Sequence, residues 1–187
     1  MEECGLKCNA INLRFRDKYI GGEFGNHEPS ISQDAIALCR EAADACRKLG
    51  GNQMIIWLGF DGFDYSFQID YVSYWNRIVK AFRDVCDYSG VPVSIEYKPY
   101  EERVHAFIDS FGTAVSVLHD VDRENLGVTL DFCHMLMKRR ILRLRQPGCW
   151  NGGNSTIYIS TTERVPRMTA YGGNREFLED SGGHVLP

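Results

Sequence analysis

Apolar residues recur at helical spacing in three segments of the chain. Between residues 35 and 49 an apolar position returns every three or four residues, with Ser30 or Ser32 as the expected N-cap and Gly50-Gly51 as the stop. A second apolar stripe runs through about residues 68–88, and a shorter helical stretch covers about residues 113–121. We therefore predict three helices, each of which turns its apolar face toward a core.

Short continuous apolar runs lie between these helices. Residues 54–58, 92–96 and 127–131 each have the length of a strand that is buried on both faces, and residues 8–13 form a weaker candidate. Strands that alternate with helices indicate βαβ units, because parallel neighbours need a crossover connection. The sequence thus predicts an α/β fold with a parallel sheet.

The alternating pattern stops after Met137. Residues 1–137 carry a net charge of -8 and residues 138–187 a net charge of +4, and the second segment has three Gly-Gly pairs and no regular apolar period. We predict one domain over residues 1–137, followed by an irregular, atypical tail over residues 138–187. Our hypothesis for the tail is a shifted reading frame or a rearranged gene end. The alternative is a disordered or partner-binding extension, since its basic stretch could be a solvated helix face.

The composition excludes several classes of protein. Hydrophobic residues make up 44% and charged residues 25% of the chain, as in globular domains. The net charge is -4, without clustered cations before the tail, so nucleic acid is not an expected partner. No apolar run is long enough to cross a membrane and no signal peptide is evident, so we expect a cytoplasmic protein. Seven cysteines without CxxC spacing predict reduced thiols.

Polar residues follow two of the predicted strands, and the carboxyl ends of parallel strands are where active sites form. Glu96 and Lys98 alternate with apolar neighbours and project to one side, as a metal ligand and a proton donor would; a Glu–Lys ion pair is the structural alternative. Asp131 and His134 end the next strand. If a helix begins there, the two side chains reach one edge as oxygen and nitrogen ligands of a divalent ion; otherwise His134 caps or packs.

These residues belong to an ordered set of motifs, which also includes residues 12–24, with Gly21-Gly22-Glu23-Phe24, and residues 57–65. Over about residues 5–137 the order and spacing resemble the xylose isomerase-like TIM-barrel proteins. The resemblance is closest to bacterial sugar isomerases that lie between xylose isomerase and L-rhamnose isomerase. It implies a (β/α)8 TIM barrel, of which this chain would hold about strands 3 to 6.

The resemblance also implies roles for the candidate residues. Glu96 and Asp131 would bridge divalent ions (Mn, Mg or Co), and His134 would ligate the second ion and so take part in catalysis. Lys98 would be catalytic and substrate-binding, through a hydrogen bond to the sugar oxygen at the centre of the hydride shift. Trp57 would form an apolar wall of the substrate pocket, with plain core packing as the alternative.

The function that we expect is divalent-metal-dependent isomerisation of a small sugar, in which a hydride shift interconverts an aldose and a ketose. A sugar epimerase or a metal-dependent endonuclease of the same barrel type is a second interpretation, and the acidic charge disfavours the nuclease. A third is an inactive half-barrel remnant or interaction module, because 187 residues are fewer than the roughly 250 of a complete barrel. The resemblance further implies a homo-oligomer.

Overall fold

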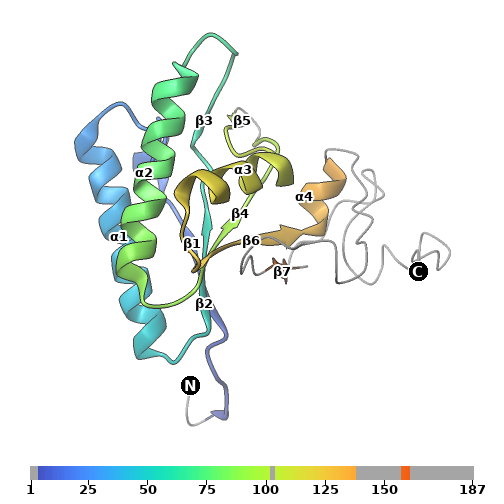
Figure 1. The fold of residues 1–187 in the computed structure, drawn as a ribbon. Coiled ribbons are helices and arrows are strands. Elements are labelled where there is room, and N and C mark those ends of the chain that lie inside the picture. Colours follow the sequence, from blue (N-terminus) through green and yellow to red (C-terminus); the bar gives the residue numbers. More distant parts are fainter. Residues whose placement is uncertain (1–3, 102–103, 138–156, 161–187) are drawn as a thin grey trace, which may run out of the picture.

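A five-stranded parallel sheet forms the centre of the molecule (Figure 1). The computed structural model describes residues 4–101, 104–137 and 157–160. All neighbouring strands in the sheet are parallel, which confirms the predicted fold class. In spatial order the strands are β1 (Ala10–Arg14), β2 (Gln53–Trp57), β4 (Val93–Glu96), β6 (Leu126–Asp131) and β7 (Ile157–Ser160).

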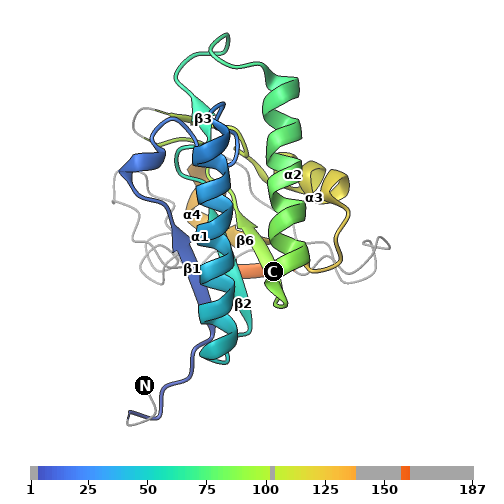
Figure 2. The same ribbon diagram turned by 90° about the vertical axis from the view of Figure 1, so that its left-hand side faces the viewer.

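Helices connect the parallel strands and pack against the sheet. In Figures 1 and 2, α1 and α2 run side by side. The helices are α1 (Pro29–Lys48), α2 (Tyr71–Ser89), α3 (Phe111–Val121) and the short α4 (Phe132–Met137), which begins directly after β6. Among the described residues, none of the helices combines the length and the apolar character that crossing a membrane requires.

The start of α1 differs from the prediction. The helix begins at Pro29 and its N-cap residue is Glu28, so Ser30 and Ser32 lie inside the first turn. Proline suits this position because the first N–H groups of a helix have no partner within the helix, and proline lacks one. The hydroxyl of Ser32 instead donates to the carbonyl of Phe24 in the preceding loop.

The two faces of the sheet have different chemistry. Met54, Ile56 and Ile95 belong to the apolar core that the strands share with the helices. Side chains alternate along a strand, so residues one position away point to the opposite face. On that face the hydroxyls of Ser94 and Thr129 lie 2.7 Å apart, and both side chains are fully buried. The same face carries polar side chains up to the carboxyl ends of the strands.

Three short elements lie outside the predicted pattern. A 3-10 turn, η2 (Asp17–Tyr19), follows β1. The strands β3 (Gly62–Phe63) and β5 (His105–Ala106) form a separate antiparallel pair, which joins the loops after β2 and β4. Two-residue strands are too short to show an apolar period in the sequence.

The strand β7 lies within the segment for which the sequence predicted no regular element. Its residues pair with β6 from Val128 opposite Ile157 to Asp131 opposite Ser160. Four residues are at the lower limit at which an alternating pattern can be recognised. The other predictions for residues 138–187, including the altered reading frame, fall outside the described residues.

Candidate metal centre

The side chains of Glu96, Asp131 and His134 converge at the carboxyl end of the sheet. Glu96 is the last residue of β4, Asp131 is the last residue of β6, and His134 lies in the first turn of α4. One potential ligand atom from each residue lies within 4.8 Å of the other two. All three residues are buried, with exposed fractions of 7%, 1% and 3%. The structure therefore brings together the three residues that the sequence suggested as metal ligands.

The two carboxylate oxygens of Asp131 have different surroundings. Oδ1 accepts the N–H groups of Cys133 at 2.7 Å and of His134 at 3.3 Å, so it caps the start of α4. Oδ2 is buried, makes no hydrogen bond among the described residues and lies 4.0 Å from Nε2 of His134. A buried carboxylate oxygen is costly unless a donor or a cation compensates it. The arrangement therefore fits a cation beside Oδ2.

The imidazole of His134 is oriented by the backbone. Its Nδ1 lies 2.8 Å from the carbonyl oxygen of Tyr97, which can only accept a hydrogen bond. Nδ1 therefore carries a proton, and in the neutral ring Nε2 presents its lone pair on the side of Asp131. A hydrogen bond from the second ring nitrogen to a carbonyl is the usual way to orient a metal-binding histidine. Two carboxylates and one neutral imidazole form a donor set suited to a divalent ion.

Lys98 and Trp57 lie next to each other beside this cluster. Trp57 ends β2, the strand adjacent to β4, and Lys98 follows β4 by two residues. Nζ of Lys98 is 5.2 Å from the centre of the Trp57 ring and 2.6 Å from a carboxylate oxygen of Glu101. The guanidinium of Arg14 lies 4.7 Å from the same ring. The partly exposed indole is thus held by cation–π contacts at a strand end, outside the helix-facing core.

A second pair of buried carboxylates joins the loops that follow β1 and β2. The carboxylate of Asp61 accepts the backbone N–H groups of residues 23–25 and the hydroxyl of Tyr74, at distances of 2.7 to 3.1 Å. Both carboxylate oxygens of Glu23 lie within hydrogen-bond distance of the N–H of Phe60. Two of the motifs that carry the family resemblance therefore hold the loop structure together.

The environment of this pair raises the pKa of both acids. Burial, and second the neighbouring charge of Asp61, raise the pKa of Glu23 to about 9. Burial also raises the pKa of Asp61 to about 6, while its hydrogen bonds from Tyr74 and the backbone act in the opposite direction. Asp61 receives four hydrogen bonds, which favour its ionised form. We infer that at neutral pH Asp61 is ionised and Glu23 carries a proton.

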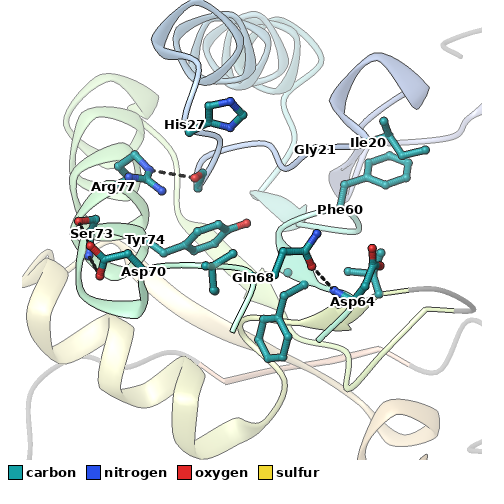
Figure 3. Close-up of a pocket in the computed structure, with 15 residues that line it drawn as sticks. Ile20, Gly21, His27, Phe60, Asp64, Gln68, Asp70, Ser73, Tyr74 and Arg77 are labelled. Carbon is teal, nitrogen blue, oxygen red and sulfur yellow. Dashed lines mark hydrogen bonds between the residues drawn. The ribbon is translucent and has the colours of Figure 1, made fainter. Parts of the chain in front are cut away.

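A separate cavity, drawn in Figure 3, lies between the loops after β1 and β2 and the start of α2. It has a volume of about 590 Å³, and its lining does not include the residues of the carboxylate–imidazole cluster. Polar groups in its wall bond to one another: Nε of Arg77 donates to the carbonyl of Gly25, and the hydroxyl of Ser73 donates to Asp70. Among the described residues, the cluster at the strand ends is the better candidate for chemistry.

The sequence predicted no role in the cluster for two of its contributors. Asn12 donates a hydrogen bond to Glu96 from β1, and Tyr97 contributes through its backbone carbonyl. Asn12 lies in a strand that showed only a weak apolar pattern. Any residue type can supply a carbonyl, so the residue type at position 97 carries no signal for that role.

The fold and the cluster together define a class of protein: a parallel α/β protein with a candidate divalent-metal centre at the carboxyl ends of its strands. The family described as Xylose isomerase-like TIM barrel matches residues 1–148. The chain belongs to this family, as the motifs suggested.

This chain is similar to only a part of each of the relatives and solved structures that it matches. A xylose isomerase from Brucella canis is 26% identical over 144 residues, which cover 72% of this chain and 33% of the relative. The D-allulose 3-epimerase from Methylomonas sp., in complex with D-allulose, aligns with a TM-score of 0.58 and 20% identity over 72% of this chain and 45% of that one. The IOLI protein with a bound zinc atom aligns with a TM-score of 0.53 and 18% identity, over 68% and 42%.

The chain spans about a third of the length of the curated relatives that it matches. The family match and the structural similarities confirm the predicted TIM-barrel fold, of which this chain holds a part.

Proposed function

We propose that this chain carries the metal-binding part of a sugar isomerase that interconverts an aldose and a ketose with the help of a divalent ion. The observation that supports this proposal is the convergence of Glu96, Asp131 and His134 at the carboxyl end of a parallel sheet. The family match and the similarity to xylose isomerase support the proposed reaction class.

The residues around the cluster suit this chemistry. A divalent ion held by the three side chains would polarise the sugar's carbonyl and hydroxyl oxygens. Lys98 lies beside the cluster, and the carboxylate of Glu101 orients its ammonium group to donate to a sugar oxygen. The indole of Trp57 offers an apolar surface that excludes water from the reacting carbons. A small sugar would therefore bind between Lys98, Trp57 and the ligand cluster.

A sugar epimerase of the same barrel type is the second candidate, since the solved structures with this fold include a D-allulose 3-epimerase. The same donor set serves both reactions, because each requires sugar oxygens to be held next to the reacting carbon. The products distinguish them: an isomerase converts an aldehyde into a ketone, whereas an epimerase inverts a carbon and leaves the carbonyl in place.

Calorimetric titration with Mn²⁺ is expected to show saturable binding, and the Mn²⁺-loaded protein is expected to form ketose from at least one member of a panel of aldoses. The titration is then repeated with Mg²⁺, Co²⁺ and Zn²⁺. Epimerisation of a ketose substrate, without conversion of any aldose, would favour the epimerase. Binding without any turnover would favour an inactive remnant of the barrel. A protein that binds none of the four ions would contradict the proposed metal centre.

Lys98→Met is expected to lower turnover by about 100-fold or more, because a donor placed at a reacting oxygen commonly contributes a factor of that size. The affinity for Mn²⁺ is expected to stay within about twofold of the unchanged protein, since the ammonium is no metal ligand. Lys80→Met makes the same chemical change on the exposed face of α2 and serves as the control. Equal turnover in the two variants would exclude Lys98 from the reaction.

A further inference from the structure

The side chain of Asn12 reaches the cluster of Glu96, Asp131 and His134 from a strand that contributes no ligand to it. It lies on β1, and β2 separates β1 from β4 in the sheet. Nδ2 of Asn12 is nevertheless 3.3 Å from Oε2 of Glu96. The side chain therefore extends over the polar face of the sheet to the end of the second strand along.

The chemistry of the two groups decides the direction of this hydrogen bond. An ionised carboxylate can only accept hydrogen bonds, so the amide of Asn12 must present its NH2 group to Glu96. The amide carries no charge. It can therefore hold the carboxylate in place without competing with a cation for it, as a lysine or arginine at the same position would.

The two carboxylate oxygens of Glu96 make different contacts. Oε2 accepts from Asn12, while Oε1 lies 3.8 Å from Nδ1 of His134. Asp131 shows the same division, because its Oδ1 accepts from the backbone of α4 and its Oδ2 faces His134. In both residues one oxygen accepts a hydrogen bond that fixes the carboxylate plane, and the other lies within 4.0 Å of the His134 ring.

We propose that Asn12 is a positioning residue that orients Glu96 as a metal ligand. This inference rests on the proposed metal centre and adds β1 to the elements that build it. The carboxylate of a glutamate side chain turns about several single bonds, and fixing it before the ion arrives lowers the ordering cost of binding.

The test is a calorimetric titration of Asn12→Leu with Mn²⁺. Leucine has a similar size but no donor, and the affinity is expected to fall by about 10- to 100-fold, as is usual when a metal ligand loses its hydrogen-bond partner. Asn52→Leu is the matched control: Nδ2 of Asn52 donates to Oδ1 of Asn9 at 3.0 Å, at the amino end of the sheet. This control is expected to bind Mn²⁺ within about twofold of the unchanged protein.

A second measurement separates positioning from a loss of folding. The visible absorption of bound Co²⁺ reports the ligand geometry, and the spectrum at saturation is expected to differ between Asn12→Leu and both the unchanged protein and Asn52→Leu. An Asn12→Leu variant with unchanged Mn²⁺ affinity and an unchanged Co²⁺ spectrum would overturn the role of Asn12 and leave the proposed function standing. Failure of the unchanged protein to bind either ion would instead overturn the metal centre, and the role of Asn12 with it.

Discussion

Asp131→Asn is expected to lower the affinity for Mn²⁺ by more than about 100-fold, since even the loss of a partner behind a ligand costs about 10- to 100-fold. The substitution is selective because the two oxygens of Asp131 do different things. Asparagine keeps a carbonyl oxygen that can accept from the backbone of Cys133 and His134, so the cap of α4 is retained. Its NH2 group takes the place of Oδ2 and repels a cation.

The metal-free protein is expected to remain folded in this variant. A buried carboxylate oxygen that has no donor among the described residues destabilises the folded state, so its replacement by a neutral amide leaves the free energy of unfolding unchanged or raises it. Thermal unfolding with and without Mn²⁺ checks both statements, because a bound ion raises the midpoint of unfolding. Asp131→Asn is expected to lose that increase.

Asp70→Asn is the matched control for this experiment. Asp70 also caps a helix, since its carboxylate accepts the N–H groups of Val72 and Ser73 at the start of α2, but it is exposed and lies outside the cluster. The variant is expected to bind Mn²⁺ like the unchanged protein. If Asp131→Asn binds Mn²⁺ as tightly as Asp70→Asn, Asp131 is not a ligand.

Asp61→Ala is expected to lower the free energy of unfolding by about 3–5 kcal/mol, the range seen when one partner of a buried charged network is removed. Three backbone N–H groups and the hydroxyl of Tyr74 lose their acceptor together, in a fully buried position. Each unsatisfied buried donor costs free energy. Urea unfolding followed by circular dichroism measures the change, and a loss below about 1 kcal/mol would contradict the assigned role of this carboxylate.

Glu23→Gln is the control substitution at the same loop junction. It also tests how the stability of the protein depends on pH. Glutamine resembles the protonated acid, so the variant is expected to match the unchanged protein near pH 5. The pKa of Glu23 in the folded state is raised from 4.5 to about 9, so the folded state binds the proton more tightly. Stability contributed by Glu23 is therefore complete below about pH 4.5 and is lost as the pH rises toward 9.

Glutamine does not titrate, so Glu23→Gln is expected to become increasingly more stable than the unchanged protein between pH 5 and pH 9. Asp61 remains in both proteins, so its own titration contributes to both curves. Parallel stability curves for the two proteins over this range would show that Glu23 is not a buried, protonated acid.

The sequence by itself determined the alternation of the longer strands and helices, and it pointed to the three residues of the cluster. Apolar periodicity is a local property, so it located α1, α2, β2, β4 and β6 to within a few residues. The cluster was predictable for a topological reason: the carboxyl ends of parallel strands meet at one edge of the sheet, and a helix that starts after Asp131 returns His134 to the same edge.

Only the tertiary structure decided how the cluster is held and which acids are protonated. The contact between Asn12 and Glu96 joins residues 84 positions apart, and it depends on a side chain that crosses an intervening strand. The raised pKa of Glu23 depends on burial and on its distance from Asp61, which lies in another loop. Hydrogen bonds and desolvation act over a few ångströms in space, and chain order alone does not specify those distances.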